Sequence, residues 1–191
     1  MANKFKGKKY IKESLLSGLG NDYKGFANYA QQLKDKSIEK EYSQLGKKKV
    51  MSNYTKLNKQ DKALFKQGEK LYFGTANCFG CHGPDAQGLP NMGPPLVKSE
   101  WVNDSKERLA KVMLHGLYGP ITVNKKKYNT PMPMPGLGAN PMFKDKDLAA
   151  IATFIRNHFG NKSGAVSESV FKKVRKETAG RATPYAVKEL E

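Results

Sequence analysis

The sequence predicts an all-α fold in which helices alternate with loops rich in glycine and proline. Helical segments over about residues 60–73 and 145–160 bracket the middle of the chain. Glycine and proline cluster between them, in residues 80–95 and 131–141, which excludes long helices there. Residues 1–60 add apolar side chains at helical spacing. The predicted architecture is a domain of helices and loops with helical extensions at its ends.

The first 60 residues are predicted to form a basic extension of two or three short amphipathic helices. They contain fourteen lysines and five acidic residues. Asn21 and Ser37, two residue types that favour helix N-termini, each precede an apolar face. The two faces are Tyr23, Phe26, Ala30 and Leu33, and then Ile38, Tyr42 and Leu45. Because short helices bury little surface alone, we expect them to pack on the next domain or to end a helical-repeat array.

Residues 61–160 are predicted to form the central domain, and residues 161–191 a basic helical tail. The last helix of the domain is expected to begin with Asp145 as its cap and to end at Gly160, a usual C-terminal residue. Its apolar stripe consists of Leu148, Ile151, Ala152 and Ile155. The tail contains a second capped helix, predicted over residues 167–180.

The formal net charge is +17, and it comes almost entirely from lysine, with only four arginines. Nucleic-acid readers favour arginine for paired contacts with guanine and phosphate, so the composition argues against sequence-specific nucleic-acid binding. The charge favours attraction to an acidic protein or to an anionic membrane surface, besides solubility. No stretch approaches the roughly 18 apolar residues that a membrane-spanning helix needs.

The segment NCFGCHG holds both cysteines of the chain and one of its three histidines. Cys78, Cys81 and His82 fit the C-x-x-C-H pattern of covalent haem c attachment. On one helical turn, the two thiols reach the two vinyl groups of one porphyrin, and the next imidazole comes under the iron. Structural zinc would need both other histidines at poor spacing. A thioredoxin-like pair would need a βαβ setting, and a disulfide between these cysteines would close a small strained loop. The pattern therefore predicts one covalent haem.

A six-coordinate haem that carries electrons usually has methionine as its second axial ligand, because a thioether raises the reduction potential. The segment YNTPMPMPGLG places Met132 and Met134 beside prolines in a rigid loop, where a methionine makes poor core filler. Both are candidates on the residues alone. Core filler is our interpretation of the other internal methionines, Met51, Met92, Met113 and Met142.

Four segments share the motifs of one family. They are GEKLYFGTANCFGCHG (68–83), GPPL (93–96), GLYGPITVNKKKYNTPMP (116–133) and LAAIATFIRN (148–157). With them, residues 61–160 resemble a class I cytochrome c domain. The resemblance implies helices and loops wrapped around one haem c, with Gly68 and Tyr72 of the first helix crossing the last helix at Ile151 to Ile155. It also implies that the Pro94 carbonyl accepts the second ring proton of His82, which fixes the tautomer.

The same resemblance assigns the remaining site residues. The family pattern Y-N-x-x-M-P-x-x-G is matched from Tyr128 to Gly136 and favours Met132 as the axial ligand. MPGLG at 134–138 also resembles the family's M-P-x-[LWF]-G, which makes Met134 the alternative. Trp101, Tyr118 and Tyr128 are expected in the haem pocket or the core. Both flanks resemble segments beside cytochrome domains at the C-terminus of larger bacterial dehydrogenase or helical-repeat proteins.

The function that follows is electron transfer by a mono-haem c-type cytochrome with His82 and Met132 on the iron. Its expected partner is an acidic redox protein, a dehydrogenase or an oxidase, steered by lysines such as Lys125, Lys126 and Lys127 if these surround the haem edge. A solvated turn is the other interpretation of that lysine run. The alternative function is a haem enzyme or gas sensor with an open sixth position, for which His115 is the candidate acid–base residue.

Localisation follows from the cofactor. In bacteria haem c is attached outside the cytoplasmic membrane, so the resemblance implies a periplasmic or otherwise exported protein. The basic start MANKFKGKKYIKESLLSGLG lacks the apolar core of a signal peptide. We therefore expect either that the chain derives from a longer exported precursor or that its start was altered.

Overall fold

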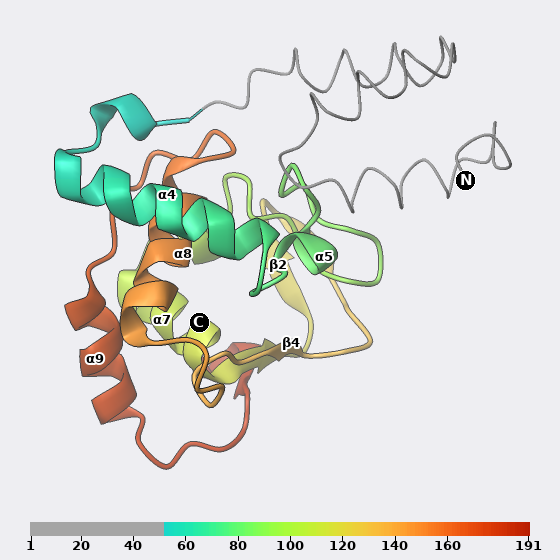
Figure 1. Ribbon diagram of the computed structural model, residues 1–191. Coiled ribbons are helices and arrows are strands. Elements are labelled where there is room, and N and C mark those ends of the chain that lie inside the picture. Colours follow the sequence, from blue (N-terminus) through green and yellow to red (C-terminus); the bar gives the residue numbers. More distant parts are fainter. Residues whose placement is uncertain (1–51) are drawn as a thin grey trace, which may run out of the picture. The chain divides into compact units, whose positions relative to one another are not determined.

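The computed structural model describes residues 52–191, and the predicted helices before residue 52 lie outside them. The described part is mainly helical, which confirms the predicted fold class, and it adds five short strands (Figure 1). The elements are η2 (Tyr54–Lys56), α4 (Lys59–Phe73), α5 (Phe79–His82), α6 (Glu100–Asn103), α7 (Lys106–His115), β1 (Gly116–Tyr118), β2 (Ile121–Val123), β3 (Lys126–Tyr128), β4 (Met134–Pro135), α8 (Asp145–Asn157), α9 (Glu168–Glu177), β5 (Tyr185–Ala186) and η3 (Val187–Glu189).

Helix α4 begins where its sequence provides a cap. The side chain of Asn58 accepts a hydrogen bond from the backbone N–H of Asp61 at 2.8 Å. Asp61 also places a negative charge in the first turn, where the helix dipole favours it. The helix buries Phe65, Gly68 and Tyr72 on one face. These three residues recur at the spacing of one helix face, which packs on the core.

Helices α4 and α8 cross in close contact at Gly68 (Figure 1). A Cβ atom on Gly68 would lie 1.9 Å from the carbonyl oxygen of Ala150 and 2.8 Å from the Cβ of Phe154. Beside this crossing, the rings of Tyr72 and Phe154 lie 5.4 Å apart. The predicted contact of Gly68 and Tyr72 with the last helix is therefore present. The glycine lets the two backbones approach more closely than any larger residue would allow.

Helix α8 starts at Asp145, within the expected segment, but its cap and its end differ from the prediction. Lys144, rather than Asp145, is the cap, and its N–H donates to the Asp147 carboxylate at 3.0 Å. The helix ends at Asn157, three residues before Gly160. It stops there because the Asn157 carbonyl accepts a hydrogen bond from the Asn53 N–H at 2.8 Å, and the following residue is extended. All residues from Leu148 to Asn157 are buried, since helices α4, α7 and α9 surround α8.

The tail after residue 160 packs on the helices that precede it. Helix α9 lies against α7 and α8. Beyond it, β5 adds a parallel strand to β1, whose other edge pairs antiparallel with β4. Strands β2 and β3 form a separate hairpin. The proposed division into residues 1–60, 61–160 and 161–191 stays a prediction. No helix within residues 52–191 has the length and apolar character needed to cross a membrane.

Candidate haem site

The C-x-x-C-H segment forms the single helical turn that the chemistry requires. Cys78 is the N-cap of α5, and Cys81 and His82 lie in the turn itself. Both cysteines are free thiols. Burial raises the pKa of Cys78 to about 12, so this thiol is neutral at pH 7. A thioredoxin-like nucleophile needs the opposite shift. The structure therefore does not favour a redox-active dithiol.

The imidazole of His82 is buried and is oriented by one backbone carbonyl. Its Nδ1 atom lies 2.8 Å from the carbonyl oxygen of Pro94, which is the hydrogen bond that the resemblance implies. Burial lowers the pKa of His82, so the ring is neutral near pH 7. A neutral ring that donates from Nδ1 keeps its lone pair on Nε2. The geometry thus leaves His82 with one nitrogen ready to bind a metal.

The chain packs tightly around this histidine at Gly93. A Cβ atom there would lie 2.9 Å from the Cys81 carbonyl oxygen and 3.2 Å from the His82 Cε1 atom. The GPPL segment can therefore lie directly against the imidazole only because glycine precedes the proline pair. This contact explains why Gly93 and Pro94 occur together at this point of the sequence.

Cys78, Cys81 and His82 line one large cavity with an open mouth. Its unfilled space, mouth included, is about 1220 Å³. The wall is mostly apolar, and His82 is its only titratable nitrogen base within the described residues. The apolar wall residues include Leu109, Val112, Met113, Leu117, Ile121, Val123, Leu137, Ile151 and Ile155. A flat apolar macrocycle fits such a wall, because burying its surface removes it from water.

The two candidate methionines occupy different environments. Met134 lies in β4 and lines the cavity together with His82. Met132 lies before the strand, is 62% exposed and is absent from the cavity wall. Strand β4 is fixed by its pairing with β1, in which Met134 lies opposite Leu117. The structure therefore brings the alternative candidate, and not Met132, to the site.

The three aromatic residues predicted for the haem pocket or the core also lie in different environments. Trp101 is buried and lines the cavity, and its indole N–H donates to the Thr122 carbonyl at 3.1 Å. Tyr128 packs against the buried cluster that contains Trp101 and Val123 but is not part of the cavity wall. Tyr118 is exposed, so its assignment to pocket or core was wrong.

The core-filler interpretation of the other methionines holds for one of them. Met113 is buried at the cavity wall. Met92 lines the same cavity but is exposed, and Met142 is exposed and lies outside the cavity wall, so these two do not fill the core. Met51 lies outside the described residues. A flexible methionine is tolerated at such surface positions because its exposure costs little stability. The sequence around Met92 and Met142 does not indicate that they are exposed.

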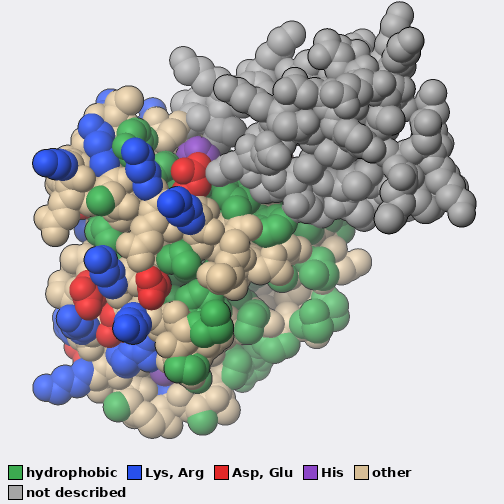
Figure 2. All heavy atoms as spheres, in the orientation of Figure 1, with side chains coloured by type: hydrophobic (Ala, Val, Ile, Leu, Met, Phe, Trp, Pro, Cys, Tyr) green, Lys and Arg blue, Asp and Glu red, His purple; other side chains and the backbone are tan. Residues whose placement is uncertain are grey.

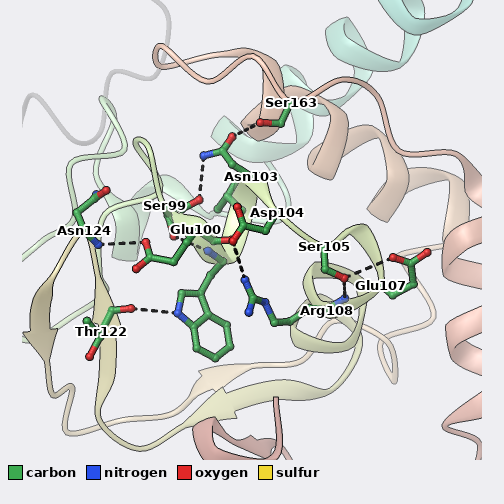
Figure 3. Close-up of polar contacts among 12 residues, drawn as sticks. Ser99, Glu100, Asn103, Asp104, Ser105, Glu107, Arg108, Thr122, Asn124 and Ser163 are labelled. Carbon is green, nitrogen blue, oxygen red and sulfur yellow. Dashed lines mark hydrogen bonds and ion pairs between the residues drawn. The ribbon is translucent and has the colours of Figure 1, made fainter. Parts of the chain in front are cut away.

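A polar network fixes the β2–β3 hairpin beside the cavity (Figure 3). The Asn124 N–H donates to the Glu100 carboxylate at 3.1 Å, and the Asn124 side chain donates to the Val97 carbonyl at 3.0 Å. Arg108 donates to the Glu100 carbonyl at 2.9 Å. These bonds connect the hairpin and α7 to α6. They therefore stabilise the position of the cavity-wall residues Ile121 and Val123.

The two remaining histidines lie away from the cavity. His115 Nε2 lies 2.6 Å from the Thr178 hydroxyl, and its ring packs edge-on against Tyr185. His158 stacks on Phe154 at 4.7 Å. Neither contributes to the cavity wall. In residues 52–191 no three His, Cys, Asp or Glu side chains gather into a site for a bare ion.

Sequence reasoning missed most of the cavity wall. Val112, Met113 and Leu117 come from α7 and β1, and Ile121 and Val123 from the hairpin. Alternation of apolar and polar residues in ITV is the signal that marks one face of β2 as buried. The segment is only three residues long, so its alternation could not be distinguished from the irregular pattern of a loop.

A buried histidine with one free nitrogen, two adjacent thiols and an apolar cavity wrapped by crossing helices define a c-type haem-binding domain. The family model described as Cytochrome c matches residues 65–159. A relative named cytochrome c-552, from Thermus thermophilus, is 32% identical over 126 residues, which cover 63% of this chain and 90% of the relative. A second cytochrome c-552, from a designated strain of Thermus thermophilus, is also 32% identical over 126 residues, and 80% of its length is covered.

The chain belongs to the cytochrome c family, as its class I motifs predict. Membership implies a covalently bound haem c with its iron, which confirms the cofactor prediction. It also makes electron transfer the general function of this domain. The cavity wall fits this cofactor because it combines two thiols, one free imidazole nitrogen and apolar side chains.

Proposed function

We propose that the protein is a mono-haem electron carrier in which Cys78 and Cys81 hold the haem, and His82 and Met134 are the axial ligands. The observation that carries this proposal is that these four side chains, from two distant segments, line one apolar cavity. When bound, haem c supplies an iron that changes its charge by one electron. The thioether and the apolar wall both favour the reduced form and so raise the potential.

Met134 replaces Met132 as the preferred ligand for a structural reason. A thioether that is 62% exposed, as in Met132, would have to leave solvent and displace its own turn to reach the cavity. The Thr130 hydroxyl also donates to the Met132 carbonyl at 3.0 Å, which holds this turn. Met134 is already at the wall. The motif in which it lies, MPGLG, is the second of the two family patterns in this loop.

The alternative function, an enzyme or sensor with an open sixth position, finds no His, Asp, Glu, Lys or Arg other than His82 among the described residues of the cavity wall. Its candidate, His115, is directed to Thr178 and Tyr185 rather than to the cavity. Burial also lowers the pKa of His115, so the ring carries no charge near pH 7. Electron transfer needs no such group, since no substrate binds the iron.

The proposed partner is an acidic redox protein. Lys125, Lys126 and Lys127 are exposed in the hairpin whose residues Ile121 and Val123 line the cavity. The net charge of +17 adds long-range attraction toward an acidic surface. We infer that lysines guide the encounter and that electrons pass through the nearby mouth of the cavity.

Export is part of the same proposal, because haem c attachment in bacteria occurs outside the cytoplasmic membrane. Haem-stained protein is expected in the periplasmic or membrane-associated fraction of cells that carry the native gene. Mature haem protein found only in the cytoplasmic fraction would contradict export.

The ligand assignment is tested with Met134→Ala and Met132→Ala, two matched changes within one loop. Both variants should keep one covalent haem, counted from the pyridine spectrum of the denatured protein. Met134→Ala is expected to lose the sulfur–iron charge-transfer band of the oxidised protein and to bind carbon monoxide when reduced. Met132→Ala should keep the band. The reverse pattern would restore Met132 as the ligand.

A further inference from the structure

The C-terminal tail is hydrogen-bonded to the sheet that carries Met134. In this sheet β1 is the central strand, with β4 on one edge and β5 on the other. Leu117 of β1 lies opposite Met134 on one side and opposite Tyr185 on the other. Since β4 is only two residues long, pairing with β1 alone gives it little stability. The third strand comes entirely from the tail.

Arg175 of α9 ties the end of the methionine loop to the tail. Its Nη1 donates to the Gly138 carbonyl at 2.6 Å, and its Nε donates to the Asp145 carboxylate at 2.8 Å. The N–H of Gly138 donates to the Leu114 carbonyl in α7 at 2.9 Å. Gly138 is therefore fixed on both of its polar atoms, one by α7 and one by α9. Because Arg175 is cationic, its hydrogen bond to the Gly138 carbonyl is charge-assisted, and such bonds are stronger than those between neutral groups.

Apolar packing adds to these bonds. Tyr185 and Val187 of the tail are buried in the cluster that contains Leu117 and the cavity-wall residue Trp101, and Met134 packs against this cluster. The Arg181 guanidinium lies 3.5 Å from the centre of the Tyr185 ring and pairs with Glu189 at 2.8 Å. These contacts hold the tail segment that carries β5 against residues that form the cavity wall.

The parts that make these contacts lie beyond residue 159, where the match to the family model ends. We propose that Arg175 and strand β5 are positioning elements that hold Met134 at the cavity and so keep the sixth coordination position closed. This inference rests on the proposed role of Met134 as a ligand. A thioether binds iron weakly, and movement of β4 away from β1 would withdraw it from the cavity. Every contact of the tail with this region opposes that movement.

The first experiment removes the donors of Arg175 while keeping its aliphatic stem. Arg175→Met should keep its covalent haem and helical circular dichroism, yet show a weaker sulfur–iron band and about tenfold faster carbon monoxide binding. Its midpoint potential should fall, because the thioether is released in part. Arg175→Lys, which keeps one cationic donor, should recover part of the band. Lys172→Met is the matched control, since Lys172 is exposed on the same helix and pairs with Glu168.

The second experiment acts on the strand. Tyr185→Ala removes the buried ring and should open the sixth position in the same way, whereas Tyr185→Phe should not, because it keeps the packing. An unchanged band and unchanged carbon monoxide kinetics in both Arg175→Met and Tyr185→Ala would overturn the inference.

Met134→Ala, measured in parallel, separates this inference from the ligand assignment. If Met134→Ala loses the band and the tail variants do not, only the positioning role fails. If Met134→Ala keeps the band, the ligand assignment fails, and the inference falls with it.

Discussion

His158 shows how one buried side chain makes stability depend on pH. Its ring contacts Phe65, Phe154 and Phe159, and its Nδ1 atom is buried without a hydrogen-bond partner among the described residues. Burial lowers its pKa from 6.5 to about 4. A charged histidine near the end of a helix would interact favourably with the helix dipole. The aromatic environment favours the neutral form instead.

Stability should therefore decrease as His158 is forced to bind a proton. Because the folded pKa is below the unfolded one, its contribution is complete above pH 6.5 and is lost as the pH falls toward 4. The loss is on the order of 2 kcal/mol, discounted for partial exposure. His158→Phe keeps the stacking and should lose less stability over this window. Urea midpoints measured for both haem proteins between about pH 7 and pH 4.5 check this, and parallel curves would exclude His158 as the cause.

Helix crossing is the feature that decides the fold at the scale of elements. Gly68 brings α4 against α8, and the crossing places Tyr72 where its hydroxyl donates to the Gly83 carbonyl at 3.0 Å. Gly83 directly follows His82, so the helix contact is connected to the haem-binding turn. The packing of the two helices thus helps to position His82, the proposed iron ligand.

Gly68→Ala tests the crossing. Helix propensity alone would make alanine more stable than glycine by about 1 kcal/mol. The added Cβ would lie 1.9 Å from the Ala150 carbonyl oxygen, so we expect a net loss of about 2–4 kcal/mol instead. Lys70→Ala, at an exposed position of the same helix, should change stability by no more than about 0.5 kcal/mol. Chemical denaturation of the haem proteins measures both, and an equal effect of the two changes would contradict the close contact.

At the scale of the molecule, one face of the described residues carries basic and apolar side chains in different regions. On the face shown in Figure 2, lysine and arginine gather over α4 and α9, whereas hydrophobic side chains gather toward β2 and β4. Met92 and Met132 are among the exposed hydrophobic residues. Long-range attraction by lysines and short-range apolar contact near the cavity are therefore available together. Such a combination favours fast encounter without a long-lived complex.

Lys126→Glu/Lys127→Glu tests whether the hairpin lysines steer the encounter. Oxidation of the reduced protein by ferricyanide, a small anion, should slow by about threefold or more at low salt and depend less on ionic strength. Lys173→Glu/Lys176→Glu changes the net charge equally on α9, which contributes nothing to the cavity wall, and should have a smaller effect. Stopped-flow absorbance measures the rates. Equal slowing of the two variants would assign the effect to net charge alone.

Local chemistry explains how much of the site the sequence could predict. Cys78, Cys81 and His82 are adjacent on one turn, so their spacing fixes their geometry wherever that turn lies. The helix crossing at Gly68 and the hydrogen bond from His82 to Pro94 could be predicted from the family motifs. Met134 was not chosen over Met132, because two residues of one loop differ only in what packs against them. That difference depends on strand β1, which lies earlier in the chain.

By itself, then, the sequence determined the helical class, the family and the turn proposed to bind the haem, since these depend on spacing along one segment. Only the tertiary structure decided which methionine reaches the cavity, which aromatic residues line it and that the tail pairs with the sheet beside it. Those outcomes depend on contacts between segments distant along the chain, such as Leu117 with Met134 and Tyr185. No local pattern specifies such contacts, because their free energy exists only once the whole core has packed.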